Sequence, residues 1–120
     1  MRTIKVFDLI PRRVLVTRAS ARSIERNLAG ALTDGQGKFT LDFVGIDGLT
    51  PSFLDEILSI LDEHTQDTNG RQYTVTMTNP PTELSSKFAA VGRGHAATID
   101  ASPEGIWTIS KGKQKPVLGR

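Results

Sequence analysis

Patterns of histidine, cysteine and glycine that support catalysis or metal binding are sparse in this chain of 120 residues. The two histidines, His64 and His95, lack the spacing of a zinc site, and no cysteine is present to act as a thiolate ligand or nucleophile. The Gly-x-Gly at residues 92–94 follows a helical pattern and precedes a strand pattern, the reverse of the order in a dinucleotide-binding fingerprint. We therefore predict no catalytic residue, no metal site and no cofactor, and a protein that is not an enzyme.

Carboxylates are the remaining candidates for acid–base chemistry, and adjacent pairs occur at residues 55–56 and 62–63. Neighbouring helix residues point about 100° apart, so neither pair forms a general acid–base dyad, and we interpret both as a solvated helix face. Asp42 interrupts an apolar strand pattern near its carboxyl end, where open α/β sheets place ligand sites. Two interpretations of Asp42 stay open: a ligand-binding carboxylate that acts with Arg18, or a cap for nearby loop amides.

The elements that must position these residues follow from hydrophobic periodicity. Strands are expected at residues 3–7 and 14–17, joined as a hairpin, and at 38–44, 72–78, 96–100 and 106–110. Helices are expected at residues 19–32, from Pro51 onward, and from Thr82 to Gly92 or Gly94. The run at 38–44 is apolar at Phe39, Leu41 and Phe43 and also at Val44, followed by Ile46, so we expect a central strand that is covered on both faces.

Alternating strands and helices predict a single α/β domain with a mixed, mostly parallel sheet and antiparallel strands at its ends. The composition agrees, since 38% of the residues are hydrophobic and one core suffices for this length. The domain is expected to cover residues 1–110, and residues 111–120 are expected to be a basic, flexible tail. No apolar run approaches the ~20 residues of a membrane span, and no secretory signal or cysteine occurs. These absences predict a cytoplasmic protein that does not contact a membrane.

Charge is distributed unevenly along the chain, with +5 in residues 1–26, −7 in 27–70 and +4 in 71–120. Such clusters could steer partners of either sign to different faces. Nucleic-acid binding is therefore an alternative function, carried by the residues Arg12, Arg13, Arg18, Arg22 and Arg26 and the tail from Lys111 to Lys115. The single Trp and single Tyr lie outside these basic clusters, so a stacking platform for bases is not expected.

One segment resembles a known family. The residues 41–58 read Leu-Asp-Phe-Val-Gly-Ile-Asp-Gly-Leu-Thr-Pro-Ser-Phe-Leu-Asp-Glu-Ile-Leu. They are similar to the strand-to-helix segment of the STAS-like proteins of unknown function, which are relatives of the anti-sigma-factor antagonists. Thr17-Arg18 before an alanine-containing helix resembles a second element of that family. The matched segments run from about residue 15 to residue 61, a little under half of the chain.

The resemblance implies a STAS-like fold with a single layer of helices against the sheet. In anti-sigma-factor antagonists, a serine at the corresponding helix start is phosphorylated by a kinase of the histidine-kinase-like ATPase type, and Ser52 is the matching serine here. The surrounding residues differ, with Thr50, Pro51 and Phe53 in place of the aspartate, a serine and the glycine. Thr50 is a second candidate phosphoacceptor. Helix capping is the alternative role for Ser52 and for Thr50.

The function implied by the resemblance is a non-enzymatic regulatory module that docks on a histidine-kinase-like ATPase or an anti-sigma-like regulator. The docking surface is expected to include Asp42, Asp47, Phe53, Asp55, Glu56 and Arg18. Two of these residues have a structural alternative, since Phe53 could belong to the core and Arg18 could form an ion pair with Asp42.

Overall fold

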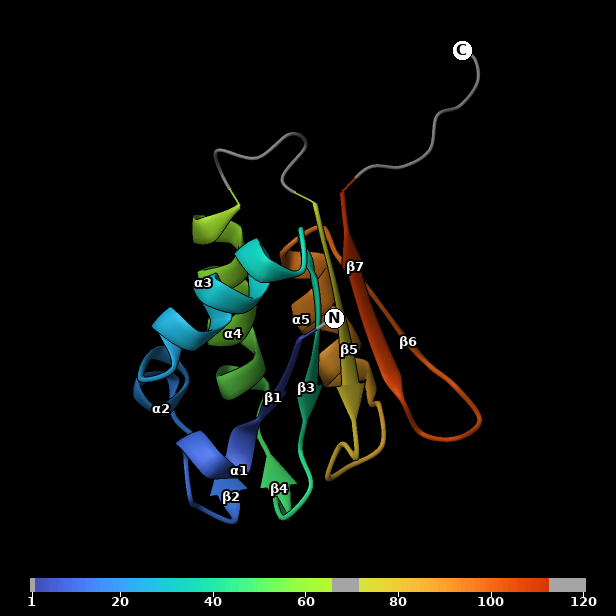
Figure 1. Ribbon diagram of the computed structural model, residues 1–120. Coiled ribbons are helices and arrows are strands. Elements are labelled where there is room, and N and C mark those ends of the chain that lie inside the picture. Colours follow the sequence, from blue (N-terminus) through green and yellow to red (C-terminus); the bar gives the residue numbers. More distant parts are fainter. Residues whose placement is uncertain (1, 66–71, 113–120) are drawn as a thin grey trace.

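The computed structural model describes residues 2–65 and 72–112, and a five-stranded sheet runs through it (Figure 1). The strand order is β1-β3-β5-β7-β6. The strands β1, β3 and β5 are parallel, whereas β7 is antiparallel to both β5 and β6. Their bounds are β1 (Arg2–Lys5), β3 (Lys38–Asp42), β5 (Tyr73–Thr78), β6 (Thr98–Ala101) and β7 (Trp107–Lys111).

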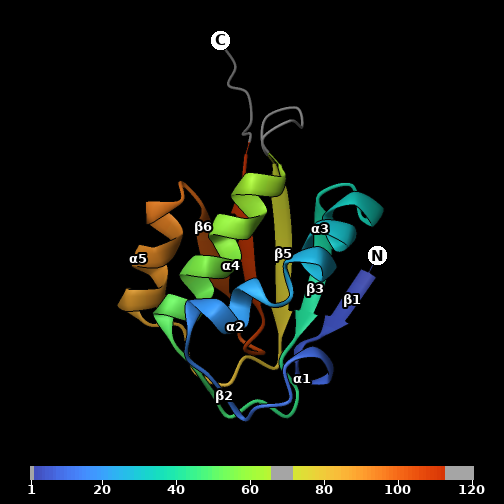
Figure 2. The ribbon, with the colours of Figure 1, turned by 90° about the vertical axis from the view of Figure 1, so that its left-hand side faces the viewer.

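The longer helices form one layer on one face of this sheet (Figure 2). They are α2 (Arg18–Arg22), α3 (Glu25–Asp34), α4 (Pro51–His64) and α5 (Ser86–Gly94). The helical turn α1 (Val6–Leu9) and the parallel strand pair β2 (Val14–Leu15) and β4 (Gly48–Leu49) lie beyond the carboxyl ends of β1 and β3. Among residues 2–65 and 72–112, no helix has the length and apolarity that crossing a bilayer requires.

The core lies between the helical layer and the sheet. Along β5, the residues Tyr73, Val75 and Met77 are buried, and the intervening threonines are half-buried on the opposite face. The helix α4 crosses the middle of this layer and buries six apolar side chains, each worth about 1.5–3 kcal/mol, at Phe53, Leu54, Ile57, Leu58, Ile60 and Leu61. In the same layer, toward the β6 edge of the sheet, the rings of Phe88 in α5 and Trp107 in β7 lie 5.3 Å apart.

The predicted α/β class and the mostly parallel sheet are confirmed. Antiparallel strands were expected at both ends of the sheet, but they occur only at the β7–β6 end, because the other edge strand, β1, is parallel to β3. The predicted first hairpin is wrong, because β2 pairs with β4 in parallel and does not pair with β1. The strand expected at residues 3–7 ends early, since Val6 begins α1 and is buried there. The helix expected at 19–32 is two helices, α2 and α3, separated at residues 23–24.

The strand predicted at 38–44 is present as β3, but its place in the sheet and its burial differ from the prediction. It lies between β1 and β5, and β5 is the central strand. One face only of β3 is buried, with Phe39 and Leu41 toward the helices and Thr40 on the half-exposed side. The apolar residues that suggested a strand covered on both faces lie after its end, where Phe43 and Ile46 enter the core from a turn.

The boundary expected after residue 110 lies one residue early, because β7 includes Lys111. The Lys111 ammonium contacts Asp62 in α4 at 2.7 Å, so this residue belongs to the folded domain. The rest of the predicted tail, residues 113–120, lies outside the described residues.

Gly35 and Gly94, at the ends of two different helices, differ in how closely other atoms approach them. At Gly35, which ends α3, a Cβ atom would lie 1.7 Å from the carbonyl oxygen of Lys38, whereas at Gly94 nothing lies within 4 Å. We expect Gly35→Ala to lower the free energy of unfolding by at least about 1–3 kcal/mol. Gly94→Ala should leave it unchanged or raise it by up to about 1 kcal/mol. Urea denaturation of both variants measures this, and equal stabilities would contradict the packing at Gly35.

Candidate functional site

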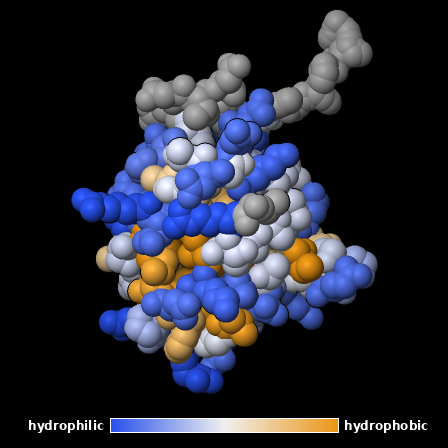
Figure 3. All heavy atoms as spheres, in the orientation of Figure 1, coloured by the Kyte–Doolittle hydropathy of each residue, from blue (hydrophilic) through white to orange (hydrophobic). Residues whose placement is uncertain are grey.

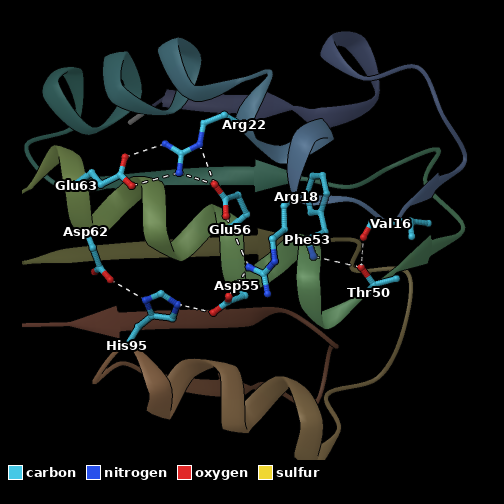
Figure 4. A network of polar contacts seen from close by, with 10 residues as sticks. All are labelled: Val16, Arg18, Arg22, Thr50, Phe53, Asp55, Glu56, Asp62, Glu63 and His95. Atoms are coloured by element: carbon cyan, nitrogen blue, oxygen red, sulfur yellow. Dashed lines mark hydrogen bonds and ion pairs between the residues drawn. The ribbon is translucent and has the colours of Figure 1, made fainter.

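The start of α4 is fixed by Thr50. Its hydroxyl oxygen accepts a hydrogen bond from the Phe53 N–H at 3.2 Å and donates one to the Val16 carbonyl at 2.7 Å (Figure 4). The Thr50 N–H also donates to the Leu15 carbonyl at 3.0 Å. Thr50 is therefore the N-cap residue, and it ties the start of α4 to β2.

Ser52 lies on the first turn of α4 and is exposed to solvent. Its side chain forms no hydrogen bond with any other residue in the described ranges 2–65 and 72–112. The capping role considered for Ser52 is therefore wrong, because Thr50 has that role. Ser52 presents a free hydroxyl at the amino end of a well-anchored helix.

Phe53 does not line a docking surface. Its side chain is 1% exposed and belongs to the apolar face of α4. The prediction of an exposed aromatic anchor is therefore wrong, and the core alternative is confirmed. The helical period explains this placement, since Phe53 shares a face with Ile57 and Ile60.

Arg18 lies over α4 and pairs with its carboxylates. Its Nη1 atom is 2.5 Å from Asp55 Oδ2 and 3.7 Å from Glu56 Oε1. The hydrogen bond to Asp55 raises the pKa of Arg18 above its ordinary value. The expected pair of Arg18 with Asp42 is wrong, because the acidic residues on α4 occupy the guanidinium instead.

Asp42 and Asp47 lie away from this cluster, at the last position of β3 and in the segment that follows it. The Asp42 Oδ1 atom accepts hydrogen bonds from the Val44 N–H at 3.0 Å and from the Asn79 side chain at 2.9 Å. Partial burial opposes ionisation of Asp42, but these hydrogen bonds outweigh it and lower its pKa. The loop-capping interpretation of Asp42 is confirmed. Asp47 accepts from Arg13 Nε at 2.7 Å on the surface.

His95, which was considered from the sequence only as a zinc ligand, joins α4 to the end of α5. The Nε2 atom of His95 lies 2.7 Å from Asp55 Oδ1, and its Nδ1 atom lies 2.7 Å from Asp62 Oδ2. Lys111 contacts the other oxygen of Asp62 at 2.7 Å (Figure 4 shows the histidine and both aspartates). The contacts therefore run from α2 through α4 and α5 to β7. The spacing of Asp55 and Asp62, two helical turns apart, was the available signal.

His95 is 13% exposed at its side chain and has a carboxylate oxygen on each ring nitrogen. The two contacts hold the ring against α4 at both of its nitrogen atoms, so His95 is a structural clamp between helices.

A second group of ion pairs surrounds Arg22 of α2. Its guanidinium contacts Glu56 and lies 2.8 Å from Glu63 and 3.4 Å from Glu25. The hydrogen bond to Arg22 lowers the pKa of Glu63. The interpretation of the acidic residues on α4 as a solvated face is therefore wrong, since arginines of α2 pair with them.

Three side chains near Arg22 lie close enough together to be considered as metal ligands. One ligand atom each from Glu25, Glu63 and His64 lies within 4.8 Å of the other two. The Arg22 guanidinium already contacts both carboxylates, and His64 Nε2 contacts Glu25 at 2.8 Å. The Arg22 guanidinium thus supplies the positive charge that a metal ion would bring, and the contacts support an ion-pair network here.

Comparison with known proteins gives no relative. No protein-family model, no curated protein and no solved structure gives a significant match to this chain. The resemblance of residues 15–61 to the STAS-like proteins therefore stays a prediction.

The assignment of the cap is testable with a matched pair of variants. Thr50→Ala removes the acceptor for the Phe53 N–H and the donor to the Val16 carbonyl. We expect it to lower the free energy of unfolding by about 0.5–2 kcal/mol. Ser52→Ala should change it by less than about 0.5 kcal/mol. Chemical denaturation measures both values, and a larger loss for Ser52→Ala would contradict the assignment.

The Asp55 contacts predict a pH dependence of stability. Partial burial opposes ionisation of Asp55, but the hydrogen bonds from Arg18 and His95 outweigh it and lower its pKa. A lowered pKa in the folded state contributes stability above the unfolded-state value of about 3.9, and this contribution is lost as the pH falls through the folded-state value. The stability difference between wild type and Asp55→Asn should therefore shrink from pH 7 toward acid pH.

Urea denaturation at a series of pH values measures that difference. Asp100→Asn is the control, because Asp100 is exposed and has no ion pair among the described residues. A difference for Asp55→Asn that stays constant down to pH 2 would contradict the inferred contacts.

Proposed function

We propose that this chain is a non-enzymatic regulatory module of STAS-like type that docks on a protein partner and is switched by phosphorylation of Ser52. A histidine-kinase-like ATPase or an anti-sigma-like regulator is the partner that the sequence resemblance favours. The observation that carries the proposal is the exposed Ser52 hydroxyl at the start of α4, next to a separate N-cap residue, Thr50.

The surroundings of Ser52 suit a phosphoryl group. The amino end of a helix stabilises an anion through its free N–H groups and dipole. Asp55 and Glu56, three and four residues further on, would repel a phosphate if they were free. Arg18 pairs with both of these carboxylates, and His95 contacts Asp55, so their charge is largely compensated.

Ser52 is favoured over Thr50 as the phosphoacceptor. The Thr50 hydroxyl is engaged in the cap and in the bond to β2, and its phosphorylation would break both. A phosphate on Ser52 would instead add a charge of about −2 to an intact surface. A partner that buries this surface would then have to desolvate the phosphate, which weakens binding.

The arrangement of the arginines favours a protein partner over nucleic acid. Arg13, Arg18 and Arg22 each contact carboxylates of this chain, so much of the basic cluster is already neutralised. Nucleic-acid binding stays the alternative, because Arg12 and Arg26 are exposed and have no ion pair with the described residues. Nucleic-acid binding would be recognised by an affinity that falls steeply as the salt concentration rises.

Charge variants at residue 52 test the switch. Affinity purification of the protein from its native host, followed by mass spectrometry, identifies the partner and the phosphopeptide that covers the start of α4. Ser52→Asp should then weaken binding of that partner by at least about tenfold, whereas Ser52→Ala should bind as the wild type does. Calorimetry with purified partner measures both, and equal affinities of the two variants would contradict the switch.

A further inference from the structure

Apolar side chains reach the surface at one end of the molecule. The large hydrophobic residues that are exposed in the described part of the chain are Leu9, Val14, Val16 and Val44, at 39%, 49%, 48% and 53%. They belong to α1, to β2 and its continuation, and to the turn after β3. Figure 3 shows apolar surface among hydrophilic residues in this lower region, where Figure 1 places α1, β2 and β4.

These segments pack directly on one another. A Cβ atom at Gly48 of β4 would lie 3.2 Å from Val14 Cγ1, and one at Gly45 would lie 3.4 Å from the ring of Phe7 in α1. The backbone N–H groups of Asp47 and Gly48 both donate to the Arg13 carbonyl. The strand β2, the turn after β3 and α1 therefore form one continuous surface.

The strand β2 is paired along one edge. The carbonyls of Arg13 and Leu15 accept hydrogen bonds from the β4 side, and β2 has no other strand neighbour among residues 2–65 and 72–112. Main-chain groups of a strand point to alternate edges. The N–H and C=O groups of Val14 and the N–H group of Val16 therefore point to the open edge. An open edge with exposed valines is a template for a further strand.

Two arginines precede the exposed strand. Arg12 is exposed and has no ion pair with the described residues. Arg13 contacts Asp47, and its side chain is 74% exposed. Arg18, which follows the strand, is already paired with Asp55 and Glu56 and adds little charge. A free arginine at the start of an apolar strand complements a segment with apolar and acidic side chains.

We propose that the open edge of β2 binds an extended segment of the partner protein, in which apolar and acidic residues alternate, as an added strand. This inference rests on the proposed function and names the chemistry of the partner. The site adjoins the switch, because the Val16 carbonyl accepts the hydrogen bond from Thr50, two residues before Ser52.

A library of short random peptides, displayed on phage and selected on the full chain, tests the proposal. Selected peptides should alternate apolar and acidic residues, and a synthetic peptide of the enriched sequence is then used in fluorescence anisotropy. Val14→Pro removes the outward N–H group but leaves the bonds to β4, and it should weaken binding by at least about tenfold. Val14→Thr, which retains the N–H group and the branched side chain, should bind within about threefold of the wild type.

Circular dichroism verifies that Val14→Pro is folded. If it is not, Val14→Glu replaces it, because a carboxylate on the edge repels an acidic segment without removing a backbone group. Val14→Glu should lose the peptide as well.

Four results would overturn the proposal. The first is a peptide consensus without acidic residues, and the second is a selected peptide that binds Val14→Pro as tightly as the wild type. The third is single-stranded RNA binding that Arg12→Glu abolishes and Val14→Pro does not change, which assigns the surface to nucleic acid. The fourth is a dimer in sedimentation that Val14→Pro dissociates, which assigns the edge to a second copy.

Binding of the variants to the native partner distinguishes a failure of this inference from a failure of the proposed function. If Val14→Pro binds the partner as the wild type does and Ser52→Asp does not, the edge-strand inference fails alone. If no partner responds to either variant, the proposed function fails.

Discussion

The burial of one face of α4 against the sheet is the constraint on which the rest of the molecule depends. That face supplies six buried side chains, and its position leaves the opposite carboxylates facing α2, α5 and the end of β7. Moving a neighbouring helix away from α4 would separate these half-buried charges and leave them uncompensated. The ion pairs therefore favour one arrangement of the helices around α4. The exposed start of α4 is consequently a fixed surface.

The sequence predicted the elements that have strong periodicity. The strict alternation at residues 72–78 and the wide apolar stripe after Pro51 identify β5 and α4 because the burial of each is decided by its own pattern. The partner of β2 could not be predicted in this way. A two-residue strand has no pattern of its own, and its pairing with β4 is decided by the backbone of Thr50 and Gly48.

The candidate site was predicted only in part, because local sequence patterns do not specify contacts between separate elements. Ser52 and Thr50 were named as candidates through the family resemblance, but which of them caps the helix depends on the neighbouring Val16 carbonyl. His95 follows α5 in a glycine-rich segment, and its two aspartate partners come from another helix. Such contacts between elements have no counterpart in local spacing, so tertiary packing had to supply them.

The hydrogen bond from Thr50 to Val16 joins a helix start and an edge strand through a single hydroxyl. Where two ligands shift the same structural element, the coupling between their sites is reciprocal. Any free energy by which a charge at the helix start disfavours a ligand on the strand is the free energy by which that ligand disfavours the charge. The phosphate proposed for Ser52 and a ligand on the edge would therefore oppose each other by one and the same free energy.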